Sequence, residues 1–133
     1  MASRNDTRRL LNYRLQMLFK NHADWIKGFN GITAATCFKK LATEATEAME
    51  TPQDMDEHAD CLLVLFSAIA LAGYTLDEVL AQAQKKHLVN LTRTWQHKPD
   101  GTLQHIDVCT CSQPAGLDND EHGAFCIACQ KPV

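Results

Sequence analysis

The chain has 133 residues, enough for one domain with a small appendage. Its formal charge of −3 and pI near 6.0 exclude a global attraction to nucleic acid or to an anionic membrane. The first nine residues are polar and basic, and the longest apolar run, residues 61–73, is too short to span a bilayer. We therefore expect a soluble, cytoplasmic protein with no membrane or nucleic-acid partner.

Hydrophobic residues recur at helical spacing in four segments, and no strand-period segment of useful length occurs in residues 1–98. The third segment begins at Thr51-Pro52, a typical N-cap followed by a proline at the first helical position, and stops at Gly73. The fourth begins with a capping box formed by Thr75 and Glu78. The predicted class is all-α, with helices at about residues 7–26, 33–50, 52–72 and 76–94.

The third predicted helix is apolar nearly all round from Cys61 to Leu71. A helix of this composition is buried on every side. In a chain of this size, such burial requires either a central position or contact with a second copy. We therefore expect a homo-oligomer, either a homodimer or a homotetramer.

A glycine-containing stretch at residues 22–31 breaks the first helix and carries two large aromatic residues, Trp25 and Phe29, with Asn30 beside them. The two rings can stack on a flat ligand, and the amide can hydrogen-bond the edge of a base. The alternative is that the rings cover the core. The sequence leaves both interpretations open.

The most informative stretch runs from Glu44 to Asp60, where seven of 17 residues are Glu or Asp. Residues three apart share a helix face, so Glu44 pairs with Glu47 on one helix and Glu57 pairs with Asp60 on the next. Carboxylates brought together need a compensating charge, and hard cations such as Mg²⁺ take oxygen ligands. The alternative is a solvated acidic face whose first-turn acids compensate the helix dipole.

Cationic and amide side chains suited to phosphate lie on two of the predicted helices. Lys40 stands four residues before Glu44, and Lys86, Asn90 and Arg93 occupy one continuous face of the fourth helix. An ammonium, an amide and a guanidinium fork match phosphate oxygens. Taken singly, these residues are equally consistent with a solvated surface.

The acidic pattern resembles a known signature. Glu44-x-x-Glu47 and Glu57-x-x-Asp60, followed by an apolar helix, are similar to the ExxE…ExxD signature of MazG-type all-α nucleoside triphosphate pyrophosphohydrolases. More particular features resemble the phage and bacterial branch that hydrolyses dATP and dGTP, which includes enzymes of the MazZ type. These features are the lead-in Phe38–Glu44, the segment Ala72–Leu80, and the residues Lys86, Asn90, Arg93 and Trp95. The resemblance covers roughly residues 10–105.

The resemblance implies a MazG-like four-helix bundle that converts a purine deoxynucleoside triphosphate to a monophosphate and pyrophosphate. It implies two or three Mg²⁺ or Mn²⁺ ions held by Glu44, Glu47, Glu57 and Asp60. One of the first two acids, preferably Glu47, then orients or deprotonates the attacking water. Glu50 offers an equally good spacing with Glu47, but it abuts the turn. The candidate substrate-binding residues are Trp25, Phe29, Asn30, Lys40, Lys86, Asn90 and Arg93.

Two questions of function stay open at this point. Relatives of the same architecture act on dUTP or on phosphoribosyl-ATP, so the base and the sugar are not decided by the sequence. A second class of function is a non-catalytic helical adaptor whose zinc knuckle binds protein or nucleic acid.

Residues 106–133 differ in character from the helical part, which we place at residues 1–105. A CxC and a CxxC pair are typical of a tetrahedral structural zinc site, with disulfides or free thiols as the alternative. We expect a zinc-knuckle-like tail, with His105 and His122 as substitute ligands. The predicted zinc ligands are Cys109, Cys111, Cys126 and Cys129.

Overall fold

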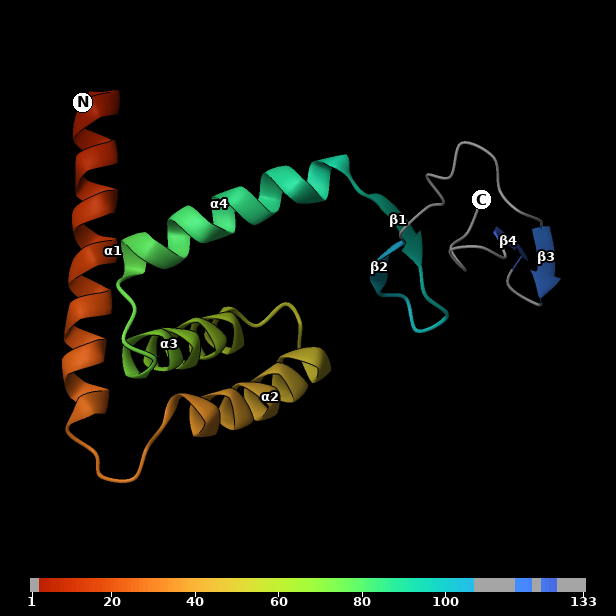
Figure 1. The fold of residues 1–133 in the computed structure, drawn as a ribbon. Helices are drawn as coiled ribbons and strands as arrows, with labels where there is room; N and C mark the ends of the chain where they lie inside the picture. Colours follow the sequence, from red (N-terminus) through yellow and green to blue (C-terminus); the bar gives the residue numbers. More distant parts are fainter. Residues whose placement is uncertain (1–2, 107–116, 121–122, 127–133) are drawn as a thin grey trace. The chain divides into compact units, whose positions relative to one another are not determined.

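A computed structural model describes residues 3–106, 117–120 and 123–126. The first compact unit, Met1–Ala83, contains α1 (Arg4–Lys27), α2 (Ala34–Glu50), α3 (Met55–Leu71) and the start of α4 (Leu76–Thr92), as Figure 1 shows. The second unit, Gln84–Val133, contains the rest of α4 and four short strands. The mostly helical architecture confirms the predicted four helices. The predicted boundary between residues 105 and 106 stays a prediction.

Side-chain caps explain where three of the helices begin. Ser3 and Asp6 form a capping box at α1, and Thr75 and Glu78 form the predicted one at α4. The predicted start of α3 is wrong. Its N-cap is Asp54, whose Oδ1 accepts a hydrogen bond from the Asp56 N–H at 2.9 Å.

The core of the first unit lies along α3, which packs against both α1 and α2 (Figure 1). Phe66, Ile69 and Leu76 are its buried large side chains, and Leu15, Phe19 and Val79 pack against them. Phe66 and Phe19 meet edge to face with ring centroids 5.3 Å apart. This cluster packs α3 against α1 and the start of α4.

The second unit contains two antiparallel hairpins: β1 (Thr94–His97) with β2 (Leu103–Ile106), and β3 (Leu117–Asp120) with β4 (Gly123–Cys126). The predicted extension of α4 to Thr94 is therefore wrong, and Trp95 lies in β1. The indole nitrogen of Trp95 donates to the Asn90 carbonyl at 2.8 Å, and its ring contacts His105 edge to face. The turn of the first hairpin places Gly101 at φ 88°, a conformation that glycine adopts without strain.

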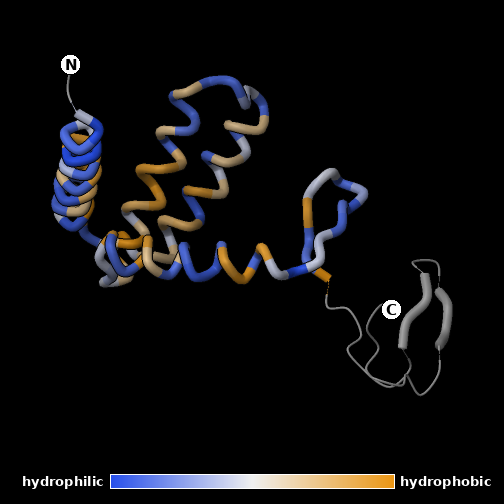
Figure 2. The backbone as a smooth tube through the Cα atoms, turned by 90° about the horizontal axis from the view of Figure 1, so that it is seen from above, coloured by the Kyte–Doolittle hydropathy of each residue, from blue (hydrophilic) through white to orange (hydrophobic). Residues whose placement is uncertain are grey.

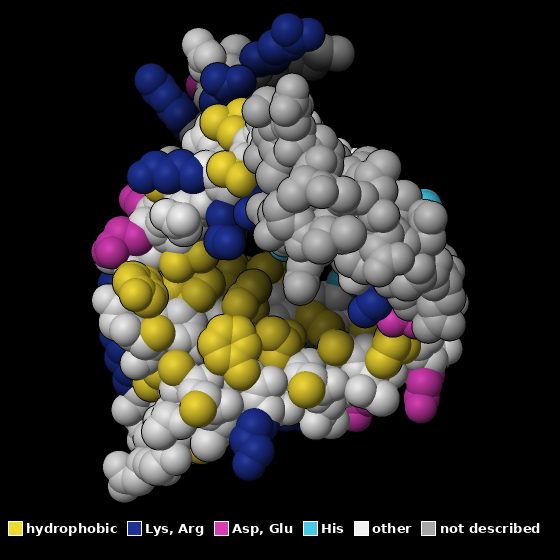
Figure 3. Space-filling view, turned by 45° about the vertical axis from the view of Figure 1, so that its right-hand side comes forward, with side chains coloured by type: hydrophobic (Ala, Val, Ile, Leu, Met, Phe, Trp, Pro, Cys, Tyr) yellow, Lys and Arg dark blue, Asp and Glu magenta, His cyan; other side chains and the backbone are white. Residues whose placement is uncertain are grey.

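Many large apolar side chains of the single chain are exposed. Figure 2 shows hydrophobic and hydrophilic residues alternating along the helices, and Figure 3 shows apolar side chains at the surface. On α3, residues Phe66–Ala70 are buried as predicted, but Leu62 is 44% exposed and Leu65 is 37% exposed. Within one chain, α3 is therefore not buried on every side.

No single helix in the described ranges is long and apolar enough to cross a membrane, although α3 and α4 pass that test as a bent pair. Among the predicted zinc ligands, Cys109, Cys111 and Cys129 lie outside the described residues, as does His122. Cys126 ends β4, and its side chain is also outside the description.

Candidate active site

Three carboxylates meet where α2 packs against α3. Glu44 comes from α2, and Glu57 and Asp60 come from successive turns of α3. Each offers an oxygen that lies within 4.8 Å of the other two. Glu44 is buried, Glu57 is half-buried and Asp60 is exposed. We call Glu44, Glu57 and Asp60 the carboxylate cluster. Such proximity is unfavourable without positive charge, because like charges repel and burial weakens hydration.

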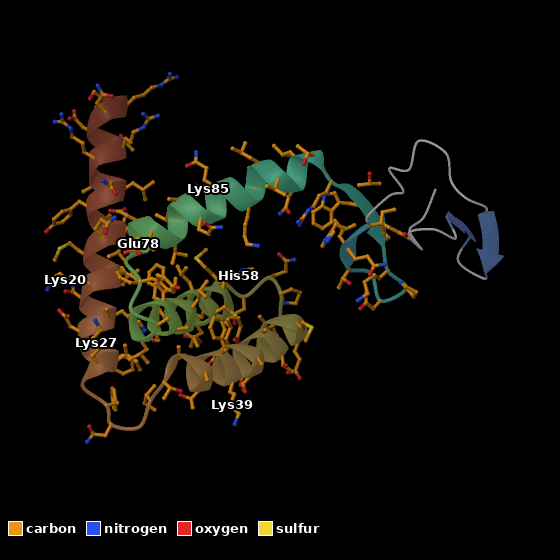
Figure 4. The ribbon with its side chains drawn as sticks, in the orientation of Figure 1. Lys20, Lys27, Lys39, His58, Glu78 and Lys85 are labelled. Atoms are coloured by element: carbon orange, nitrogen blue, oxygen red, sulfur yellow. The ribbon has the colours of Figure 1, made fainter. Side chains whose placement is uncertain are left out.

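Lys40 supplies one positive charge to the carboxylate cluster. Its ammonium forms an ion pair with the buried Glu44 carboxylate, one helical turn away. The hydrogen bond from Lys40 is the main reason that the pKa of Glu44 is lowered, and the same contact raises the pKa of Lys40. The neighbouring Lys39 points away from α3 in Figure 4. Of the two lysines, Lys40 is therefore the one placed at the cluster.

Two neighbouring carboxylates, Glu47 and Glu57, hold their protons more tightly than usual. The pKa of Glu47 is raised, first by a hydrogen bond with Glu44 and then by the charge of Glu44. The pKa of Glu57 is raised, first by desolvation and then by the charges of Asp54 and Asp60. Lys40 alone therefore does not neutralise this region.

The donor set of the carboxylate cluster fits a hard divalent cation. Oxygen ligands alone, without sulfur or imidazole, suit Mg²⁺ or Mn²⁺. Three of the four predicted metal ligands belong to the cluster, and Glu47 lies beside it as an exposed partner of Glu44. Glu50 lies outside the cluster at the exposed end of α2.

A cavity of about 360 Å³ opens next to the carboxylate cluster, between α1, α2 and α3. This volume is in the range of small-molecule sites. Most of its lining is apolar, and Glu44, Asp60 and Lys40 border it. We call it the interhelical cavity. Its other lining residues are His22, Trp25, Ile26, Ile32, Thr36, Cys37, Leu63, Val64 and Ser67.

The predicted base-binding residues have different positions relative to the interhelical cavity. Trp25 lines it and is 57% exposed. Phe29 contacts Trp25 edge to face at a centroid distance of 5.0 Å, but it does not line the cavity. Asn30 is exposed in the loop and does not line the cavity either. Trp25 is therefore the predicted aromatic residue that can contact a bound ring directly.

The predicted phosphate-binding face of α4 belongs to the second unit. Lys86 and Arg93 are exposed, and Asn90 is half-buried. The Arg93 guanidinium approaches the Asn90 side-chain oxygen at 3.5 Å. Arg93 follows the last residue of α4, so it does not lie on the helix as predicted. Phosphate binding by these residues stays a prediction.

The sequence analysis missed a pair at the wall of the interhelical cavity. His22 Nε2 on α1 and Ser67 Oγ on α3 are 2.7 Å apart, across 45 residues of sequence. Neither residue belongs to a local motif that would have singled it out. Only the packing of α1 on α3 brings them together.

Residues 18–110 match the family model described as dATP/dGTP pyrophosphohydrolase. The chain belongs to this family. The match spans the carboxylate cluster, the interhelical cavity and α4, and it confirms the resemblance seen in the ExxE…ExxD pattern. It identifies the protein as a nucleoside triphosphate pyrophosphohydrolase. No curated protein and no solved structure matches the chain.

Proposed function

We propose that this pyrophosphohydrolase hydrolyses purine deoxynucleoside triphosphates, dATP and dGTP, to the monophosphate and pyrophosphate with Mg²⁺ or Mn²⁺. The observation that carries the proposal is the carboxylate cluster beside the interhelical cavity, in a chain of this family. The cluster holds the metal, and the cavity accepts the base. Together, the cluster and the cavity provide sites for the phosphate end and the base end of a nucleotide.

Each residue of the site has a proposed task. Glu44, Glu57 and Asp60 hold the cation, which when bound neutralises phosphate charge and lowers the pKa of water. Glu47, whose pKa is raised, accepts the proton of the attacking water, because a base works best with a pKa nearer the operating pH. Lys40 binds a phosphate oxygen, and Lys86, Asn90 and Arg93 are further candidates.

The test is release of pyrophosphate from a panel of nucleotides in Mg²⁺, with EDTA as the control. The panel contains dATP, dGTP, dCTP, dUTP, ATP and phosphoribosyl-ATP. We expect purine deoxynucleotides to have the highest kcat/KM, and we expect EDTA to stop turnover. Preference for dUTP or phosphoribosyl-ATP would contradict the proposed substrate class. Full turnover in EDTA would contradict the proposed role of the carboxylate cluster.

Replacing Trp25 with Ala should raise KM for dATP about tenfold and change kcat much less. The indole lines the interhelical cavity, and stacking a base on an aromatic ring contributes roughly 1–3 kcal/mol. Steady-state kinetics at saturating Mg²⁺ measure both constants. The matched control is Tyr74→Ala, which removes an equally exposed ring that does not line this cavity. An unchanged KM in the Trp25 variant would place the base elsewhere.

We also propose a homo-oligomer in which a second copy covers exposed apolar residues of α3. Leu62 and Leu65 belong to the apolar part of α3, and both are exposed in the single chain. Light scattering should give a mass above that of one chain across a micromolar dilution series. Leu65→Arg should shift the mass toward the monomer, whereas Met55→Arg at the exposed start of α3 should not. A monomeric wild-type protein throughout the series would refute this proposal.

Zinc binding by the four tail cysteines and a cytoplasmic location stay predictions. Elemental analysis of protein purified in metal-free buffer checks the zinc.

A further inference from the structure

The His22–Ser67 pair is a polar feature in a largely apolar wall. Both side chains line the interhelical cavity, where Leu63, Val64 and Ile26 surround them with hydrocarbon. Ser67 is 4% exposed, and α3 buries it between Phe66 and Ala68. Polar groups in such a lining orient a ligand and select among ligands.

The hydrogen bonds assign the proton on the histidine ring. The Ser67 hydroxyl donates its single proton to the Leu63 carbonyl at 3.2 Å. The arrangement that satisfies both contacts has Ser67 Oγ accepting from His22 Nε2, 2.7 Å away, so that Nε2 carries the ring proton. Burial lowers the pKa of His22, although a hydrogen bond with the Leu63 backbone opposes this, so the ring is neutral near pH 7.

This tautomer leaves His22 Nδ1 as an acceptor. The Ser67 contact engages Nε2 and not Nδ1. The His22 ring lies 5.2 Å from the Trp25 ring, and Trp25 is the proposed stacking platform for the base. A neutral acceptor beside a stacking ring favours a ligand that presents a hydrogen-bond donor at its edge.

We propose that His22 accepts a hydrogen bond from the exocyclic amino group of the bound purine, and that Ser67 is the positioning residue that holds the His22 tautomer. This inference rests on the proposed function. Adenine carries a donor at N6 and guanine carries one at N2, so one acceptor can serve both bases in two orientations. Unsubstituted purine presents no donor at this edge and leaves Nδ1 unpaired when it displaces water from the cavity, whereas hypoxanthine keeps only its ring N1–H.

The experiment compares purine nucleotides that differ only in the amino group. We measure kcat/KM for dATP against purine-deoxyriboside triphosphate, and for dGTP against dITP. In the wild-type protein, each amino-bearing substrate should be favoured about tenfold, the usual effect of one lost hydrogen bond. In His22→Phe, which keeps a ring against Trp25 but removes both nitrogens, the two ratios should fall to about one.

Two further variants distinguish recognition of the amino group from a general effect on the packing of the cavity. Ser67→Ala should lower both ratios, because Nε2 loses its partner and the ring tautomers mix. Val64→Ala enlarges the same cavity without touching the pair, so it should lower kcat/KM for all four substrates and preserve the ratios. Circular dichroism checks the fold of each variant, and Ser67→Ala decides the question if His22→Phe does not fold.

The outcomes distinguish this inference from the proposed function. If the wild-type protein hydrolyses none of the four purines, the proposed function is wrong. If it hydrolyses them without preference for the amino group, the inference alone is wrong. If the preference exists but survives in both His22→Phe and Ser67→Ala, another residue recognises the amino group.

Discussion

Asp60→Asn should reduce kcat/KM for dATP at least about 100-fold while the protein stays folded. Asp60 belongs to the carboxylate cluster and borders the interhelical cavity, so it lies where metal and substrate meet. An amide keeps the size of the side chain but removes its charge. The loss corresponds to the several kcal/mol of charge stabilisation that a bound metal contributes. Pyrophosphate release at fixed Mg²⁺ measures it.

The matched control for this substitution is Asp56→Asn. Asp56 is exposed in the first turn of the same helix and lies outside the carboxylate cluster, so its variant should keep wild-type activity. Asp60→Asn should also be at least as stable as wild type without metal, because it removes a charge close to Glu44 and Glu57. Wild-type turnover in Asp60→Asn would refute the assignment of this residue.

The carboxylate pairs show how far helical spacing can place a site. Spacing of three residues predicted that Glu57 and Asp60 share a face, and both belong to the cluster. The same rule paired Glu44 with Glu47, and these two carboxyl groups share a hydrogen bond, although Glu44 is buried near the α3 carboxylates and Glu47 is exposed. Spacing gives the relation between residues on one helix. It does not give the rotation of that helix against its neighbour, which the whole packed interface decides.

The predicted start of a helix is wrong where two local capping signals in the sequence compete. Thr51-Pro52 is a good helix start, but Asp54 followed by Glu57 is an equally good capping pattern. The chain uses Asp54, because the Asp54 N–H bonds the Thr51 carbonyl at 2.9 Å and closes a turn before the helix. Trp95 is a similar case. Its segment is short, and its strand forms only by pairing with Leu103–Ile106.

The interhelical cavity could be predicted only in part. Trp25 could be predicted as a binding residue because it is a large aromatic residue beside a glycine-containing loop, which is a local feature of the sequence. His22 and Ser67 offered no such feature, since one lies within a long amphipathic helix and the other within an apolar run. Their contact depends on how α1 crosses α3. Side chains that meet across distant helices are the ones that sequence patterns predict least well.

Phe66→Ala should lower the free energy of unfolding by about 3–5 kcal/mol, the usual cost of a large cavity in a core. Phe66 is 3% exposed and packs with Ile69, Leu76 and the ring of Phe19. A typical domain has only about 5–15 kcal/mol of stability, so this variant should unfold at much lower urea concentration. Circular dichroism at one protein concentration measures the shift, with Met55→Ala, 81% exposed, as a control expected to stay within about 0.5 kcal/mol. A loss below about 1 kcal/mol would mean that α3, and the carboxylates it carries, do not depend on this core.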